Sequence, residues 1–154
     1  MRAASSGRSA CTAPRKSVTP ASAKAGDYLA LLAYVEETPE IDEALQAIRL
    51  KVRDATGCAT TLGYGPRFLH STGQLHKGGP DSGVFIQLTA PDEIDLEVPR
   101  ASYTFGILKQ AQALGDFQSL IAHGRRAIQV DLGSDVLAGL TELSELIDKA
   151  LYRG

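Results

Sequence analysis

The chain is poor in cysteine and has no long hydrophobic run. Its 154 residues include only two cysteines, Cys11 and Cys58. Cys11 lies in a polar stretch and Cys58 in a predicted buried strand, so we expect no disulfide and a reducing, cytoplasmic compartment. No apolar run approaches the roughly 18 residues that a membrane-spanning helix needs, which argues against a membrane partner.

Acidic residues are absent from residues 1–26, which carry five basic residues and little to bury. This composition predicts a disordered basic leader. We favour the accidental leader of a truncated reading frame, and the alternative is an organelle transit peptide. The remaining eleven basic residues stand against all eighteen acidic residues, a formal charge of −7. Such an acidic body argues against a nucleic-acid partner.

A second segment without acid, Gly63–Pro80, is the most informative part of the chain. It contains five glycines, two of the three histidines, Arg67 and Lys77. It also lies between two predicted buried strands. A cationic, glycine-rich connection at such a place is typical of anion sites in α/β proteins. The segment therefore predicts phosphate binding, and the alternative is a solvated turn with incidental charges.

The hydroxyl groups of Ser71 and Thr72 would add hydrogen-bond donors to this site. A helix that begins near them would direct backbone amides towards an anion. Lys77 does not follow the glycine-lysine-serine pattern of a nucleotide P-loop. The segment is therefore not expected to bind a nucleotide in that way.

Apolar runs alternate with helical patterns in the rest of the chain. This alternation predicts an α/β domain over residues 27–154, with a mainly parallel sheet and a right-handed crossover. The predicted strands are Tyr28–Val35, Cys58–Leu62, Val84–Thr89 and Ala127–Leu132.

Three helical regions are predicted between and after these strands. The first begins at Thr38 and Pro39 and ends at Gly57. Two short helices, 104–114 and 116–123, are separated by a break at Gly115 and Asp116. Ser134 is expected to cap a last helix. The predicted buried face of helix 104–114 consists of Ile107, Leu108, Ala111 and Leu114.

Lys77 is the strongest catalytic candidate, because a partly buried lysine beside a sugar phosphate could donate or relay a proton. His70 and His76 could act as acid or base, since imidazole titrates near neutrality. Their spacing matches no metal-ligand pattern, so no metal is expected. Glu36 and Glu37 are more readily explained by the acidic start of a helix than as a base. His123 is most simply a surface or capping residue.

The aromatic Phe68 is followed by the step Gln74-Leu75-His76-Lys77. These residues and the order of the elements resemble the C-terminal part of phosphoglucose isomerase, which has an aromatic residue and its catalytic lysine at these places. The closer resemblance is to bifunctional transaldolase/phosphoglucose isomerases. It covers about residues 27–132 and is specific over 59–80. Leu69 and the pair 72–73 depart from the ordinary isomerase pattern.

The resemblance implies a partial sugar-isomerase (SIS-like) domain. In the complete enzyme it implies interconversion of glucose 6-phosphate and fructose 6-phosphate through ring opening and a cis-enediol. Lys77 would assist ring opening, and His76 is a second catalytic candidate. No metal or organic cofactor is implied. Five polar side chains would line the sugar-phosphate site: Arg67, His70, Ser71, Thr72 and Gln74.

The resemblance also implies that this segment acts with other parts of the enzyme. The family's carboxylate base and phosphate loop, and the Schiff-base lysine of transaldolase, lie upstream of the lysine segment. We therefore expect the isolated chain to be inactive. The alternative is a non-catalytic sugar-phosphate module, or a subunit completed by self-association or by a partner isomerase chain.

Overall fold

Four parallel strands form one sheet in the computed structural model, which describes residues 19–152. The strands lie in the order β2-β1-β3-β4. The predicted α/β class is confirmed, and every strand pair in this sheet is parallel. The elements are η1 (Pro20–Ser22), β1 (Tyr28–Tyr34), α1 (Pro39–Thr56), β2 (Ala59–Tyr64), η2 (Arg67–His70), α2 (Gly73–Gly78), β3 (Gly83–Thr89), α3 (Phe105–Ala122), β4 (Arg126–Asp131) and α4 (Val136–Leu151).

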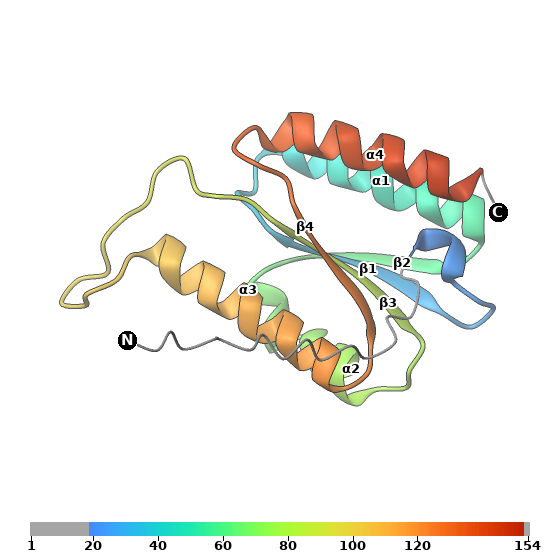
Figure 1. The fold of residues 1–154 in the computed structure, drawn as a ribbon, viewed down its shortest axis with the longest axis horizontal. Helices are drawn as coiled ribbons and strands as arrows, with labels where there is room; N and C mark the ends of the chain where they lie inside the picture. The colour runs from blue at the N-terminus through green and yellow to red at the C-terminus, as the bar shows by residue number, and fades with distance from the viewer. Residues whose placement is uncertain (1–18, 153–154) are drawn as a thin grey trace, which may run out of the picture.

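The sheet separates two layers of helices. Helices α1 and α4 cover one face, and α2 and α3 lie against the other (Figure 1). Strand β1 is buried from Leu29 to Tyr34, as expected for a central strand that is covered on both faces. No helix among the described residues is long and apolar enough to cross a membrane.

Helix α1 begins and ends where the sequence predicts. The Thr38 side chain accepts a hydrogen bond from the Ile41 amide at 3.3 Å, and Pro39 occupies the first turn. Gly57 closes the helix with a φ of 68°, a left-handed conformation that favours glycine. The crossover from β1 through α1 to β2 is therefore fixed by three local signals.

Helix α3 differs from the prediction in two ways. It is one continuous helix, not two helices broken at Gly115 and Asp116. The predicted buried face is also wrong, because Ile107 and Leu114 are each about half exposed. The buried positions of α3 are Gly106, Ala113, Asp116 and Leu120. Asp116 lies within this continuous helix, and its buried side chain pairs with Lys77.

The last helix is capped by Asp135, not by Ser134. The Asp135 carboxylate accepts a hydrogen bond from the Ala138 amide at 3.0 Å. Asp135 also has the extended backbone conformation of an N-cap residue. The predicted cap was one residue too early because both side chains can cap a helix.

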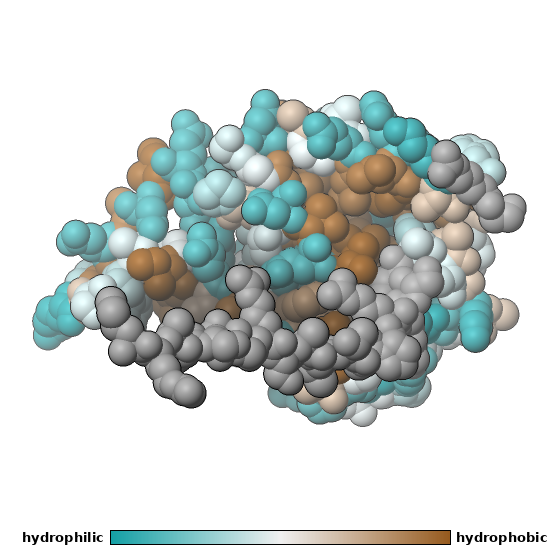
Figure 2. Space-filling model, viewed as in Figure 1, coloured by the Kyte–Doolittle hydropathy of each residue, from teal (hydrophilic) through white to brown (hydrophobic). Residues whose placement is uncertain are grey.

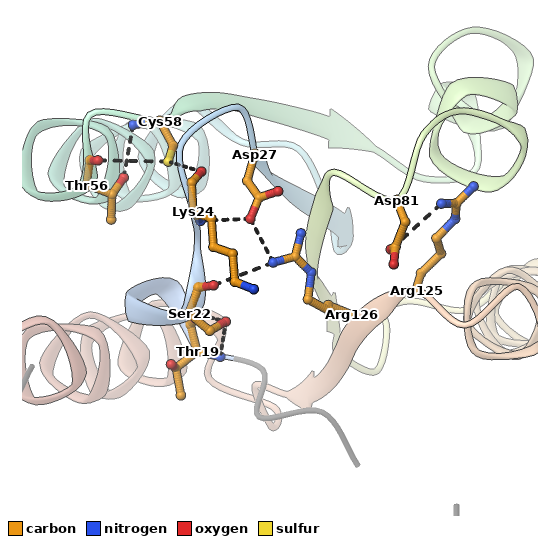
Figure 3. Close-up of polar contacts among 9 residues, drawn as sticks. All are labelled: Thr19, Ser22, Lys24, Asp27, Thr56, Cys58, Asp81, Arg125 and Arg126. Carbon is orange, nitrogen blue, oxygen red and sulfur yellow. Dashed lines mark hydrogen bonds and ion pairs between the residues drawn. The ribbon is translucent and has the colours of Figure 1, made fainter. Parts of the chain in front are cut away.

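The chain packs against the domain before the first strand. Pro20 is buried, and Arg126 donates hydrogen bonds to the Asp27 carboxylate at 2.7 Å and to the Ser22 carbonyl at 3.5 Å. Figure 3 shows this cluster between η1 and the start of β4. The expected leader ended at residue 26, whereas the fold already includes residues 19–26. The prediction for residues 1–18 lies outside the described residues.

Candidate functional site

The segment Gly63–Pro80 runs across the α3 face of the sheet. It leaves the carboxyl end of β2, forms η2 and α2, and returns to the amino end of β3. Its two basic residues therefore have different neighbours. Arg67 pairs with Glu37, just beyond the carboxyl end of β1. Lys77 lies near Arg125, which precedes β4 and donates a hydrogen bond to the Lys77 carbonyl at 2.6 Å.

The predicted substrate-binding side chains lie on the outside of η2 and α2. The Ser71 hydroxyl donates a hydrogen bond to the Phe68 carbonyl at 3.2 Å. Thr72 precedes α2 without a side-chain cap, and α2 is only six residues long. The exposed residues of this group are Arg67, His70, Ser71, Thr72 and Gln74. They are accessible to a ligand, but the structure does not gather them around one centre.

His76 is buried among aromatic rings. Only 3% of its surface is exposed, and its Nδ1 lies 2.9 Å from the Tyr28 hydroxyl. The ring stacks on Tyr28 and meets Phe85 edge-on, with centroids 5.8 and 5.0 Å away. Burial lowers the pKa of His76, while the charge of Asp116 opposes this effect. The imidazole is therefore biased towards its neutral form.

Lys77 forms an ion pair with Asp116 beneath α3. The Lys77 Nζ lies 2.6 Å from Asp116 Oδ1, and the two side chains are 27% and 2% exposed. Apart from Lys77, this carboxylate oxygen has no hydrogen-bond partner among the described residues. The buried carboxylate thus holds the Lys77 ammonium group beside the interior of the domain, while part of the Lys77 side chain remains exposed to solvent.

Polar side chains on the sheet support this pair. The Gln87 amide donates to the Ala113 carbonyl at 3.0 Å and to Asp116 Oδ2 at 3.5 Å. Gln129 donates to Gln87 at 2.8 Å. The Tyr34 hydroxyl is buried and has no hydrogen-bond partner within residues 19–152. Its pKa is raised, chiefly by burial and further by the charge of Asp116.

Asp116 is the main site residue that the sequence prediction missed. It was interpreted as part of a helix break. Its spacing from Ala113 and Leu120 places it on their side of the helix, and both of those residues are buried. An acid on that face requires a buried cationic or donor partner. This spacing was therefore the available signal, although it did not identify Lys77.

Arg125 and Gly79 fix the end of α2 beside this pair. The Arg125 guanidinium donates to the carbonyls of Lys77 and Gly79 and lies 3.8 Å from Asp81 (Figure 3). A Cβ at Gly79 would lie 2.5 Å from the Leu75 carbonyl oxygen. Glycine is therefore needed there for close backbone packing.

Two clefts lie beyond the carboxyl ends of the strands. The smaller is lined by residues that follow β1 and β3, where the chain connections leave in opposite directions, a common ligand position in α/β sheets. The larger cleft, of about 390 Å³, includes Pro66 of the glycine-rich segment. The smaller, of about 330 Å³, is lined by Glu36 and acidic residues of the β3–α3 loop. Its Lys109 pairs with Asp92, so the smaller cleft is poorly suited to an anion.

Comparisons with known proteins identify the fold class. No family model matches the chain, and no curated protein matches it. The fold is similar to that of a solved structure, a hypothetical protein from Thermus thermophilus, with a TM-score of 0.68 and 15% sequence identity. The match covers 81% of this chain and 35% of that protein. The chain therefore has an α/β fold with a parallel sheet, which is consistent with a Rossmann- or SIS-like arrangement, and it spans about a third of that protein's length.

Proposed function

We propose that this chain is the C-terminal part of the isomerase module of a transaldolase/glucose-6-phosphate isomerase. The resemblance over residues 64–79 supports the proposal, and the parallel α/β fold is compatible with it. The observation that carries it is the half-buried Lys77 ammonium, 2.6 Å from the buried Asp116 carboxylate. A lysine held in this way is positioned for proton transfer, unlike a freely rotating surface lysine.

The proposed role of Lys77 is to assist ring opening. As the bond between the anomeric carbon and the ring oxygen breaks, the ring oxygen gains a proton and the anomeric hydroxyl loses one to become the carbonyl. An ammonium N–H of Lys77 that is not directed at Asp116 would supply or relay this proton. His76 would keep α2 in place through Tyr28 and its aromatic neighbours. The exposed residues of η2 and α2 would contact the sugar phosphate.

Proton transfer between the two carbon atoms would require the family's carboxylate base. In the resemblance this base precedes the lysine segment, so the complete enzyme would carry out the isomerisation. The same proposal places the protein in the cytoplasm. Its buried Cys58 is a free thiol, as a reducing compartment favours.

Calorimetry with fructose 6-phosphate tests the proposal. We expect the full chain to bind the sugar phosphate without turnover in a coupled isomerase assay. Lys77→Met should weaken binding about tenfold or more, the usual range for a lost charged hydrogen bond. Lys149→Met is the matched control, because Lys149 is an exposed lysine on α4. Thermal unfolding of both variants must first show that each is folded.

Two results would contradict the proposal. Absence of binding by the folded wild-type chain would contradict the proposal. So would isomerase turnover by this chain alone that disappears in Lys77→Ala. Supplying the upstream isomerase segment of a bifunctional enzyme in trans separates the two functional alternatives. Restored turnover supports a part of an enzyme, whereas binding without restored turnover supports a non-catalytic sugar-phosphate module.

A further inference from the structure

The Tyr34 hydroxyl is a buried polar group that the proposed ring opening does not use. Tyr34 is 1% exposed, and its hydroxyl has no hydrogen-bond partner within residues 19–152. A buried polar group without a partner costs free energy and is rare in folded proteins. A phenylalanine would fill the same space without this cost. The hydroxyl is explained if it gains a partner in another state of the molecule.

The glycine-rich segment holds the ring of Tyr34 in place. A Cβ at Gly65 would lie 2.4 Å from this ring, so the close approach requires glycine. Phe68 meets the ring edge-on, with centroids 5.6 Å apart. Both contacts come from the segment that carries Lys77. The phenol is therefore fixed, and its hydroxyl can change partners only by turning its O–H bond or by movement of a neighbour.

Asp116 is an acceptor near the phenol. Tyr34 pairs with Thr89 in the sheet, which makes Gln87 its diagonal neighbour on the α3 face. Gln87 Nε2 in turn lies 3.5 Å from Asp116 Oδ2. The pKa of Tyr34 is raised chiefly by burial and further by the charge of Asp116, so the carboxylate acts electrostatically on the phenol. Because Asp116 Oδ1 has only Lys77 as a partner among the described residues, it can accept another hydrogen bond.

We propose that Tyr34 is a positioning residue that allows Asp116 to release Lys77 to a bound anion. In the free chain, Asp116 Oδ1 lies 2.6 Å from the Lys77 ammonium. An anion at the exposed part of Lys77 would compete for its N–H groups, since charge-assisted hydrogen bonds are strong. The buried carboxylate would then lose its cation, which is costly. A rotation of Asp116 would let it accept from the Tyr34 hydroxyl, which lowers this cost.

The exchange of donors involves no proton transfer. Lys77 remains an ammonium, Asp116 remains a carboxylate, and Tyr34 remains a neutral phenol, which its raised pKa favours. The inference rests on the proposed function only for the identity of the anion, a sugar phosphate. The exchange itself is a property of these three side chains, so it can be measured without a sugar.

A double-mutant cycle on the full chain tests the exchange. Tyr34→Phe removes only the hydroxyl, and urea denaturation gives its effect on the equilibrium constant of unfolding. In the wild type this constant should change less than about threefold, because the hydroxyl has no partner to lose. In Lys77→Met, where Asp116 needs the hydroxyl, it should rise about tenfold. In Lys77→Met/Asp116→Leu, which lacks the acceptor, the change should again be small.

A purely structural role for Tyr34 predicts a different pattern in this cycle. Tyr34→Phe would then have the same effect in all three backgrounds, and that result would overturn the proposal. A cost that is largest in the wild type would also overturn it, because the hydroxyl would already have a partner there. Circular dichroism identifies any variant that does not fold, and the next measurement leaves Lys77 in place.

Chemical labelling of Lys77 gives an independent readout in the folded chain. The amine reacts with N-hydroxysuccinimidyl acetate only when it is free of Asp116 and has lost its proton. Without the Tyr34 hydroxyl this state is more costly, so Lys77 in Tyr34→Phe should be acetylated about tenfold more slowly. Peptide mass spectrometry measures the rate. An unchanged or faster reaction of Lys77 would overturn the proposal.

Lys149 is the internal control for labelling. It is an exposed lysine on α4, and the surface over α4 at the upper edge of the view is mainly hydrophilic (Figure 2). Its acetylation rate should be the same in the wild type and in Tyr34→Phe. The ratio of the two lysine rates therefore corrects for differences in reagent concentration.

Calorimetry with fructose 6-phosphate separates this inference from the proposed function. Tyr34→Phe should weaken binding about tenfold, whereas Tyr103→Phe, at a 44% exposed tyrosine, is the matched control and should bind like the wild type. Wild-type binding that is unchanged in Tyr34→Phe would overturn the role of Tyr34 and leave the proposed function standing. If the wild type does not bind, the proposed function fails, and the cycle and the labelling still decide whether Tyr34 serves Asp116.

Discussion

The two faces of the sheet are built from different residues. The face under α1 and α4 buries sixteen hydrophobic residues, all of them aliphatic. The face under α2 and α3 buries eight, including Tyr34, Phe68 and Phe85. The second face also contains His76, Gln87 and Asp116. Hydrophobic burial is the main source of folding free energy, so the first face should stabilise the domain and leave the second available for polar chemistry.

The comparison also explains why α3 is exposed on its outer side. Its inner side packs against aromatic rings and a polar cluster, and four of its five leucines and isoleucines are exposed, the exception being Leu120. Helices α1 and α4 bury six leucines and isoleucines against the sheet, although Leu137 and Leu146 of α4 are exposed. One layer is therefore complete within the described chain. The other has an apolar surface that is suited to a further contact.

The largest losses of stability should appear when buried leucines are shortened on the two faces. Leu45 on α1 and Leu120 on α3 are both fully buried. We expect Leu45→Ala to lower the free energy of unfolding by about 4 kcal/mol, and Leu120→Ala by about 3 kcal/mol. The smaller loss reflects the smaller apolar cluster around Leu120. Urea denaturation measures both, and a clearly larger loss for Leu120→Ala would refute this ranking.

The ion pair should be the most sensitive polar feature of the α3 face. Lys77→Ala should lower the free energy of unfolding by about 3 kcal/mol, because it leaves a buried carboxylate without its partner. The double variant Lys77→Met/Asp116→Leu should remain within about 1 kcal/mol of wild type, since it removes both charges. Chemical denaturation distinguishes the two. Equal losses in the single and double variants would show that the pair is not the cause.

Asp27, just before β1, should make the free energy of unfolding depend on pH in the acid range. The Arg126 guanidinium, and then the Lys24 amide, lower the pKa of Asp27 from 3.8 to about 2. The folded state therefore binds a proton less readily than the unfolded state. The resulting stability is present above about pH 4 and is lost as the pH falls towards about 2. We expect a loss on the order of 1–2 kcal/mol in thermal unfolding. In Asp27→Asn this part of the pH dependence should disappear.

The smallest effect should come from His76. Because burial lowers its pKa, the unfolded state binds the proton more readily. Its contribution is present above the ordinary pKa of 6.5 and decreases as the pH falls below that value. His76→Phe keeps an aromatic ring and should flatten the stability profile in this range. If the dependence of stability on pH is unchanged in that variant, His76 does not contribute to it in this range.

Local signals explain what could be predicted from the sequence. The apolar runs identified all four strands, and Thr38, Pro39 and Gly57 defined α1. Helix α3 was misinterpreted because Ile107, Leu108 and Leu114 were assumed to face the core, whereas they are exposed. Lys77 was predicted as the strongest catalytic candidate, and in the structure its side chain is partly exposed and pairs with Asp116. Its substrate role remains a prediction.

The partner of Lys77 could not be predicted from local signals. Asp116 lies 39 positions further along the chain, and only the packing of α2 and α3 brings the two together. The same holds for Arg126 and Asp27, which are 99 positions apart. Periodicity identifies the face of an element, but it does not identify which charges meet between elements.

The hydrogen bonds of Arg125 impose an order on assembly. Its guanidinium holds the carbonyls of Lys77 and Gly79 from a position 48 and 46 residues later in the chain. During synthesis the lysine segment emerges well before the arginine that fastens it. The hydrogen bonds from Arg125 to α2 can therefore form only after the residues just before β4 have been synthesised. Arg125, just before the edge strand β4, thus holds the end of α2, which carries the lysine proposed to assist ring opening.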